Sequence, residues 1–223
     1  MKKEFIDIIS DADLILIGIG AEFEKEKYLK DTEAVQALNE LAQVLQGKNY
    51  FVVTTCTNDI VKDCGLNEER IVCPCGNVKL KQCNNLCDSK LFSLTDEDVI
   101  KMQKNISDGL EPDFGSCAEC GALMVLNNVY ASKYNEEGYL KDWSRYTKWL
   151  QGTLNKKLCI LELGVNLVFP SIIRWPFEKV GFYNQKATFI RVNETLYHMS
   201  EELKDKGISV AKNSIDWLLE SDI

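Results

Sequence analysis

Two closely spaced cysteine pairs interrupt an otherwise regular alternation of apolar runs and helical segments. Cys83 and Cys87 form a C-x3-C pair, and Cys117 and Cys120 form a C-x2-C pair in GSCAECG. Each short-spaced pair places two thiolates on one turn, and two such turns supply four soft ligands for tetrahedral zinc. The surrounding segment is rich in loops and too small to bury a core alone, so the metal is expected to be structural.

Two other interpretations of the cysteines stay open. Cys73 and Cys75 could join Cys117 and Cys120 instead, although one intervening residue is tight for a metal-binding turn. Alternatively, the cysteines carry no metal. The chain has nine cysteines and begins without a convincing signal peptide. A reducing, cytoplasmic setting with free thiols is therefore expected.

The rest of the chain alternates between strand-like and helix-like segments. Strands are predicted at 12–20, 49–56, 157–164, 187–193 and 208–213, the last at a sheet edge. Helices are predicted at 31–47, 94–106, 140–154, 194–207 and 214–221. Asp31 or Thr32 should cap the first helix, and Thr95 with Asp98 should form a capping box on the second. Strands that alternate with helices indicate an α/β fold with a parallel sheet, into which the cysteine-rich block is inserted.

Charge and hydropathy exclude two classes of partner. The formal net charge of −8 offers no basic excess for a nucleic-acid backbone. No run of about eighteen apolar residues occurs, so no membrane span is expected. A hydrophobic fraction of 45% is enough to bury a sizeable core.

Glycine and short polar residues gather at the ends of four predicted strands. They are Gly18, Gly20 and Ala21 after the first strand, Thr55, Asn58 and Asp59 after the second, Gly164, Val165 and Asn166 after the third, and Asn193 after the fourth. Carboxyl ends of parallel strands share one edge of the sheet, where α/β proteins bind ligands. Glycines there would let the backbone approach a diphosphate. The same residues also suit tight turns without a ligand, and Asn193 suits a helix cap.

The order of these motifs resembles that of the sirtuins, the NAD-dependent protein deacylases. IGIGAE is similar to the family's G-A-G-x-S turn, VTTCTND to its T-Q-N-x-D segment, LGVNLVFP to its G-T-S-x-x-V-x-P segment, and RVN to its I-N. The resemblance covers nearly the whole chain. It implies a Rossmann-like parallel sheet flanked by helices, in an NAD-binding domain of residues 1–70 plus 140–223. A small zinc-binding domain, residues 71–139, would be inserted into it.

The resemblance also implies a role for each strand-end residue. Phosphate would lie against Gly18, Gly20 and Ala21, and Thr55 would add a further cofactor contact. The adenosine side would be held by Gly164, Val165, Asn166 and Asn193. Asn58 and Asp59 would be catalytic residues that contact the nicotinamide ribose and carboxamide, and Asn127 would lie near the substrate entrance.

Two departures from the family pattern bear on activity. The family's catalytic His-Gly stands about eight residues before the first zinc cysteine, and here Cys75-Gly76 holds that place. The only histidine, His198, is expected on a surface helix. Deacylation needs a general base, and a thiol titrates near neutrality only if its pKa is lowered. The family's Asp-Phe-Arg element is also missing from EFEKEKYLKD, whose acidic residues are expected to form a solvated face. Few positive charges are expected near Gly18 and Gly20, so backbone amides would have to bind the phosphate.

Three functions follow as hypotheses. The first is an NAD-consuming enzyme, either a protein ADP-ribosyltransferase or an atypical deacylase, with Cys75 facing the ribose. FPSIIRWPFEKV is similar to a microbial branch of sirtuins that is associated with ADP-ribosyl transfer. An acceptor protein or an acyl-lysine protein would then be the partner. The second is a degenerate sirtuin that binds NAD or ADP-ribose without turnover, and the third is a zinc-stapled scaffold without nucleotide.

Overall fold

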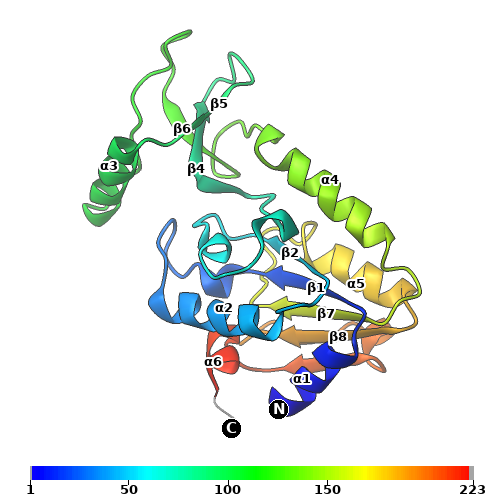
Figure 1. The fold of residues 1–223 in the computed structure, drawn as a ribbon. Helices are drawn as coiled ribbons and strands as arrows, with labels where there is room; N and C mark the ends of the chain where they lie inside the picture. Colours follow the sequence, from blue (N-terminus) through cyan, green and yellow to red (C-terminus); the bar gives the residue numbers. More distant parts are fainter. Residues whose placement is uncertain (1, 221–223) are drawn as a thin grey trace.

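A six-stranded parallel sheet forms the centre of the larger lobe (Figure 1). The computed structural model describes residues 2–220. The strand order is β3-β2-β1-β7-β8-β9, and every neighbouring pair is parallel. The strands are β1 (Leu14–Ile19), β2 (Tyr50–Thr54), β3 (Ile71–Val72), β7 (Leu158–Leu163), β8 (Ala187–Val192) and β9 (Gly207–Val210). This sheet confirms the predicted α/β class, including the edge position of the last strand.

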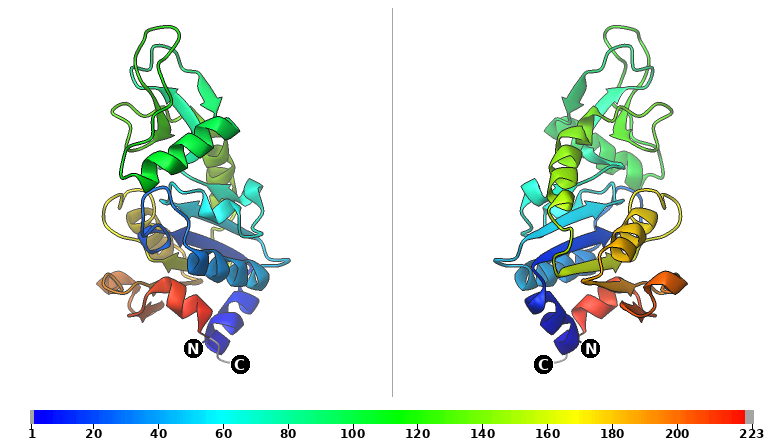
Figure 2. Two further views of the ribbon diagram at one scale, coloured as in Figure 1. Left: turned by 90° about the vertical axis from the view of Figure 1, so that its left-hand side faces the viewer. Right: turned by 90° about the vertical axis from the view of Figure 1, so that its right-hand side faces the viewer.

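Burial on both faces explains the continuous apolar runs of the central strands. Every residue of β1, β2 and β7 is buried. Helices α1 (Lys2–Asp11), α2 (Thr32–Val44) and α6 (Ser214–Leu219) contribute to the core on one face. Helices α4 (Glu137–Gln151) and α5 (Arg174–Tyr183) contribute to the core on the other face (Figure 2). Strands covered on both faces lack the alternating pattern of half-exposed strands.

The smaller lobe is built on a three-stranded antiparallel sheet of order β5-β4-β6. Its elements are β4 (Gly76–Cys83), β5 (Leu91–Ser93), β6 (Met124–Asn128) and α3 (Asp96–Ser107). The helix begins with the predicted capping box of Thr95 and Asp98. Tyr28, from the loop after β1, packs into the apolar core of this lobe beside Met102 and Phe114. The two lobes are thus tied together by the loop that leaves the first strand.

Several elements differ from the sequence-based expectation. Helices α1 and α5 and the small antiparallel sheet were not predicted, so the chain opens with a helix rather than a strand. The helix predicted at 194–207 is wrong, because only the short 3-10 helix η4 (Glu201–Leu203) forms there. The Asn193 carboxamide oxygen accepts the amides of Thr195 and Leu196 and bends the chain into a turn. His198 is exposed, but it lies on this irregular segment and not on a helix.

Three further short 3-10 helices follow strand ends or precede a strand: η1 (Ala21–Phe23), η2 (Ile60–Lys62) and η3 (Glu68–Arg70). The predicted helix at 31–47 is capped by Asp31, whose carboxylate accepts the amides of Glu33 and Ala34. The helix predicted to begin at Ser214 does begin there, with Asn213 as its cap. Within residues 2–220, no helix is both long and apolar enough to cross a bilayer.

Substitution of Gly18 tests how β1 packs against α5. A Cβ at Gly18 would lie 2.5 Å from Ile173 Cγ2 and 2.9 Å from Phe177 Cε2. Because overpacking forces side chains from their rotamers, Gly18→Ala should lower the free energy of unfolding by about 1–3 kcal/mol, measured by urea denaturation. Gly152→Ala is the matched control, with φ −72° and no comparable clash. It should change that free energy by less than about 0.5 kcal/mol. Equal midpoints for the two variants would contradict this packing.

Candidate functional site

The carboxyl ends of β1 and β7 lie in direct backbone contact. A Cβ at Gly20 would lie 2.4 Å from Val165 Cα and 2.6 Å from the Gly164 carbonyl oxygen. The chain continues from β1 to α2 on one face of the sheet and from β7 to α5 on the other. This divergence is a topological switch point, the place where open α/β sheets bind their ligands. In Figure 1 the arrowheads of β1 and β7 point toward this edge.

A cavity of about 340 Å³ opens at this edge, between the two lobes. It is lined by Ala21, Glu24, Lys25, Lys27, Thr55, Tyr130, Asn166, Val168 and Phe169. Three of these, Ala21, Thr55 and Asn166, are residues that the sequence placed at a cofactor site. They come from the ends of three different strands, whereas Tyr130 follows β6 of the smaller lobe. The structure therefore brings a part of the predicted set to one concave surface.

The loop after β1 supplies the charges of this cavity. Lys25 pairs with Asp31 at 3.4 Å, and Lys27 lies 4.7 and 4.6 Å from the ring centres of Tyr28 and Tyr130. The expectation of few positive charges near the turn is thus wrong, since two lysines face the cavity. A lysine reaches phosphate as a point charge without needing the planar fork of arginine.

Two acidic residues of the same loop hold backbone amides of neighbouring loops. Glu24 accepts the Thr57 amide at 2.8 Å and the Thr57 hydroxyl at 2.7 Å. Glu22 accepts the amides of Glu194 at 2.9 Å and Ser214 at 2.6 Å. The predicted solvated acidic face is therefore wrong for both residues. Their carboxylates connect the end of β1 to the ends of β2 and β8 and to the start of α6.

The glycines at the strand ends serve close packing. The space at Gly18 is filled by Ile173 and Phe177, and the space at Gly20 by the turn after β7. Gly164 has φ +61°, in the left-handed region that favours glycine, and its Cβ position would meet the Glu22 side chain. These glycines let the strand ends and the Glu22 carboxylate approach one another.

Asn193 and Val165 do not line the cavity, but they contact each other next to the loop that carries the lining residue Asn166. Asn193 is buried and donates its side-chain amide to the Val165 carbonyl oxygen at 3.1 Å, while its oxygen caps the turn after β8. Asn166 makes a similar turn, in which its side-chain oxygen accepts the Val168 amide at 3.0 Å. Turn formation, the alternative raised by the sequence, thus accounts for part of the role of both asparagines.

Asn58 and Asp59 are buried beneath the loop and do not line the cavity. Asn58 donates to the carbonyl oxygens of Phe23 at 3.2 Å and Leu29 at 2.7 Å, near the two ends of the loop after β1. The Asp59 carboxylate pairs with Lys79 of β4 at 2.8 Å and with Lys62 at 3.4 Å. Asn58 thus holds the loop after β1 in place, and Asp59 links the larger lobe to β4 of the smaller lobe.

Cys75 is fully buried near the cavity wall. Burial raises the pKa of its thiol to about 12, and the nearby Cys73 and Glu24 add to the shift. The pKa of Cys73 is likewise raised to about 12, mainly by burial. A thiol with such a pKa stays protonated at neutral pH and cannot accept a proton as a general base. Cys75, which the resemblance places at the family's histidine position, is therefore not expected to act as a base at neutral pH.

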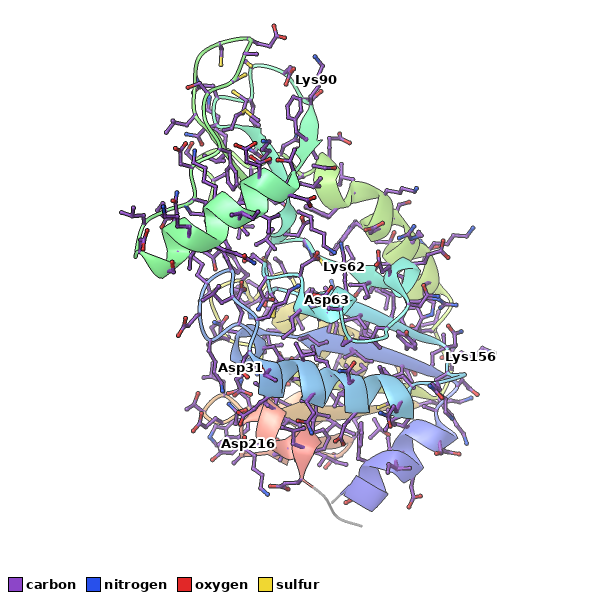
Figure 3. All side chains as sticks on the ribbon, turned by 60° about the vertical axis from the view of Figure 1, so that its left-hand side comes forward. Asp31, Lys62, Asp63, Lys90, Lys156 and Asp216 are labelled. Atoms are coloured by element: carbon purple, nitrogen blue, oxygen red, sulfur yellow. The ribbon has the colours of Figure 1, made fainter. Side chains whose placement is uncertain are left out.

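The four paired cysteines of the smaller lobe come together in one cluster. Figure 3 shows sulfur atoms, in yellow, in this lobe near Lys90. The sulfurs of Cys83, Cys87, Cys117 and Cys120 all lie within 4.8 Å of one another. Cys83 Sγ is 3.5 Å from Cys120 Sγ, and Cys87 Sγ is 3.6 Å from Cys117 Sγ. A tetrahedral zinc ion with Zn–S bonds of about 2.3 Å separates its sulfurs by about 3.8 Å, so this donor set fits zinc.

Two turns with left-handed residues shape this donor set. Leu86 has φ +51° in the turn between Cys83 and Cys87, and Gly121 has φ +71° after Cys120. The Leu86 amide donates to the Cys83 carbonyl oxygen at 3.0 Å. In this geometry, backbone amides of Cys87 and Asn85 lower the pKa of Cys83 to about 6. The rival set is not formed, because Cys73 and Cys75 are absent from this cluster.

Asn127, which the resemblance placed near the substrate entrance, does not line the cavity. It is fully buried in the smaller lobe and donates to the side chain of Gln82 at 2.6 Å and to the Asn135 carbonyl oxygen at 2.8 Å. Tyr130, which follows β6 in the same lobe, is half exposed and lines the cavity.

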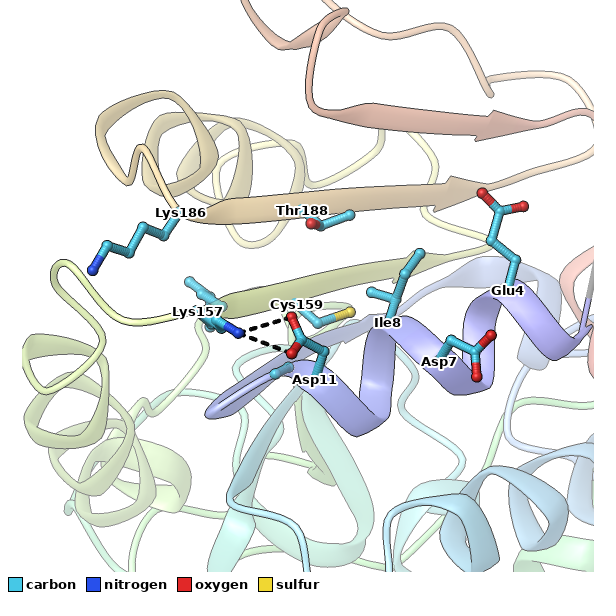
Figure 4. A pocket seen from close by; sticks show the side chains of 10 residues that line it. Glu4, Asp7, Ile8, Asp11, Lys157, Cys159, Lys186 and Thr188 are labelled. Carbon is cyan, nitrogen blue, oxygen red and sulfur yellow. Dashed lines mark hydrogen bonds and ion pairs between the residues drawn. The ribbon is translucent and has the colours of Figure 1, made fainter.

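A larger hollow of about 940 Å³ lies at the opposite, amino edge of the sheet (Figure 4). Its lining residues come from α1 and from the starts of β7 and β8. Figure 4 shows the ion pair between Lys157 and Asp11 in this hollow. Size alone does not make it the active site, since ligands of parallel sheets bind at the carboxyl edge. The smaller cavity at the switch point is the stronger candidate.

Comparison with known proteins shows which proteins this chain is similar to. No family model matches the chain. A protein ADP-ribosyltransferase of Staphylococcus aureus is 22% identical over 191 residues, which cover 82% of this chain and 59% of that protein. A "probable bifunctional ADP-ribose hydrolase/ADP-ribosyltransferase" of Fusarium oxysporum is 28% identical over 174 residues, 73% of this chain and 29% of that protein. This chain thus spans only part of both curated relatives.

Sequence reasoning missed several residues of the site, namely Glu22, Glu24, Lys25, Lys27 and Tyr130. The first four lie in the loop after β1, and this position was the signal that the sequence offered; Tyr130 follows β6, which was not predicted.

Metal content tests the cysteine cluster. Purified protein should contain about one zinc ion per chain by elemental analysis, because four thiolates complete a tetrahedral site. Cys117→Ser should lose the metal and unfold the smaller lobe, since this lobe has only a small apolar core. Cys159→Ser, altered in β7 of the larger lobe, is the control and should keep its metal. Full metal content in Cys117→Ser would contradict the assignment.

Alkylation against pH tests the state of Cys75. With a pKa raised to about 12, its thiolate fraction should stay small up to about pH 9 and rise only near pH 12. Iodoacetamide should therefore label Cys75 far more slowly in folded than in urea-unfolded protein at pH 8, as followed by peptide mass spectrometry. Rapid labelling of folded protein at pH 7 would show a reactive thiolate instead.

Structures of sirtuins match almost the whole chain. A Sir2 complex with a p53 peptide and NAD⁺ superimposes with a TM-score of 0.62 at 16% identity, over 98% of this chain and 95% of that one. A Sir2 complex with an acetylated peptide gives 0.62 at 14% identity over the same shares. At such low identity the match establishes the fold. The chain has the sirtuin fold, as its sequence motifs predicted.

Proposed function

We propose that this chain binds NAD at the switch-point cavity and transfers its ADP-ribosyl group to an acceptor protein. The observation that carries the proposal is the cavity itself. Three strand ends of a sirtuin fold meet there with two lysines, at the edge where parallel sheets bind dinucleotides. The ADP-ribosyltransferases among the relatives and the NAD⁺-bound Sir2 structure among the neighbours support the same assignment.

The proposed contacts to NAD follow from the residues that line the switch-point cavity. The diphosphate would lie near the Ala21 backbone, with Lys25 and Lys27 supplying positive charge. Asn166, with Val165 and Asn193 next to its loop, would hold the adenosine side. Gly18, Gly20 and Gly164 would allow the close approach of these loops, and Thr55 would complete the polar rim. Asn58 and Asp59 would act indirectly, by fixing the loop and the lobes around the nicotinamide ribose.

The proposed reaction breaks one bond and forms another. The glycosidic bond between ribose C1′ and the nicotinamide nitrogen breaks, and its electron pair leaves with neutral nicotinamide. An acceptor nucleophile then forms a bond to C1′ through an oxocarbenium-like state. An acceptor that is already anionic brings no proton to remove, so this transfer needs no general base. Deacylation does need one to activate a ribose hydroxyl, and protonated Cys75 cannot serve.

Zinc would be held by Cys83, Cys87, Cys117 and Cys120 as a structural ion. When bound, it would supply folding energy to the smaller lobe and no reaction step. We further propose that the larger lobe, residues 1–70 plus 140–223, is the NAD-binding domain and that residues 71–139 form the metal-binding domain.

The inert thiol also favours a second candidate, a protein that binds NAD or ADP-ribose without turnover. In that case both ligands should raise the melting temperature, because a ligand that binds only the folded state stabilises it. No nicotinamide would then be released.

Nicotinamide release tests the first function directly. The protein should release nicotinamide from NAD when an acceptor protein is present, and mass spectrometry should find ADP-ribose on that acceptor. Asn166→Ala, which removes a cavity-lining amide, should lower the rate at limiting NAD about tenfold or more, the size of effect expected for a lost hydrogen bond in a binding site. Asn105→Ala, on α3 away from the cavity, is the control and should match the wild type. Binding without release would favour the second candidate, and neither binding nor release would reject both.

A further inference from the structure

Arg174 connects the loop after β7, which carries lining residues of the candidate NAD site, to the loop after β8. It lies at the start of α5 and is 6% exposed. Its Nη2 donates to the Val165 carbonyl oxygen at 2.7 Å, in the loop after β7. Its Nη1 donates to the Leu196 carbonyl oxygen at 3.1 Å, in the loop after β8. One guanidinium thus reaches two segments that follow different strands.

Asn193 closes the same set of contacts into a ring. Its side-chain amide donates to the Val165 carbonyl oxygen, and its side-chain oxygen accepts the Leu196 amide at 2.7 Å. Val165 and Leu196 are therefore each held by both Arg174 and Asn193. These side-chain contacts add to the backbone hydrogen bond from the Gly164 amide to the Val192 carbonyl oxygen and fix the loop that carries Asn166 against the turn after β8.

A buried cluster of charged side chains also contacts the Arg174 guanidinium. Glu162, fully buried on β7, lies 3.2 Å from Arg174 Nη2 and 2.8 Å from Arg191 Nε. Arg191 also pairs with Glu178 of α5 at 2.8 Å and donates to the His198 carbonyl oxygen at 2.6 Å. The positive charges of Arg174 and Arg191 thus balance the negative charges of two glutamates. Burying such a cluster contributes little net stability compared with apolar packing, so its value is better sought in the geometry it specifies.

We propose that Arg174 is a positioning residue for NAD, which it would serve by holding the loop after β7 in its binding conformation. This inference rests on the proposed function, because the loop matters through Asn166, Val168 and Phe169, which line the cavity. A lysine at this position would keep the charge near Glu162. It would lose the planar fork that reaches both carbonyl oxygens, since an ammonium is a single point of donation.

Arg174→Lys is the test, with Arg70→Lys as the matched control. Arg70 also donates to a neighbouring side chain and to a backbone carbonyl, those of Asn49 and Tyr50, but at the amino edge of the sheet. Calorimetry should show NAD binding at least about tenfold weaker in Arg174→Lys, since small displacements of positioning groups have effects of this size. If the wild type turns NAD over, KM for NAD should rise with kcat nearly unchanged. Arg70→Lys should bind within about twofold of the wild type.

Hydrogen exchange without nucleotide separates this inference from the proposed function. The Val168 and Leu196 amides, which close the two loops, should exchange faster in Arg174→Lys and as in the wild type in Arg70→Lys. If the wild type binds no NAD, the proposed function fails while this exchange still reports whether Arg174 holds the loops. A lowered melting temperature with unchanged NAD affinity and loop exchange would overturn the inference. Should Arg174→Lys not fold, Arg174→Gln replaces it, and failure of both to fold would assign Arg174 to core stability instead.

Discussion

The backbone contact between Gly20 and the turn at Gly164 and Val165 is the constraint on which the rest of the site depends. It brings the carboxyl ends of β1 and β7 together at less than the distance that any Cβ would allow. From this point one loop passes to α2 and the other to α5, on opposite faces of the sheet. The cavity opens at the edge where the two loops diverge.

Polar side chains then hold the loops that surround this contact. Glu22 and Glu24 tie the loop after β1 to three neighbouring segments, and Arg174 with Asn193 ties the loop after β7 to the turn after β8. Tyr28 carries the first of these loops into the core of the metal-binding lobe. The loop after β1 thus contacts both the metal-binding lobe and the cavity. None of the four cysteines lines the cavity.

The sequence predicted the parts of this structure that depend on local pattern. Continuous apolar runs located the central strands, and capping residues such as Asp31 and Thr95 located two helix starts. The cysteine spacing predicted the four thiols that the structure brings together. Three residues of the cavity, Ala21, Thr55 and Asn166, were found because they follow strand ends.

What the sequence could not supply depends on contacts between distant segments. Glu22 meets amides at positions 194 and 214, and Lys27 lies between rings from both lobes. No spacing along the chain encodes such contacts. The helix predicted at 194–207 had suitable residues, but the carboxamide of Asn193 and the hydrogen bond from Arg191 to His198 stabilise a different path. Tertiary contacts here override local propensity.

A crystal structure of the protein soaked with NAD tests the central claim most directly. We expect the dinucleotide, intact or cleaved, to cross the ends of β1 and β7 and to contact Ala21, Thr55 and Asn166. An empty switch-point cavity at saturating NAD, or a dinucleotide bound instead in the hollow beside α1, would contradict this account.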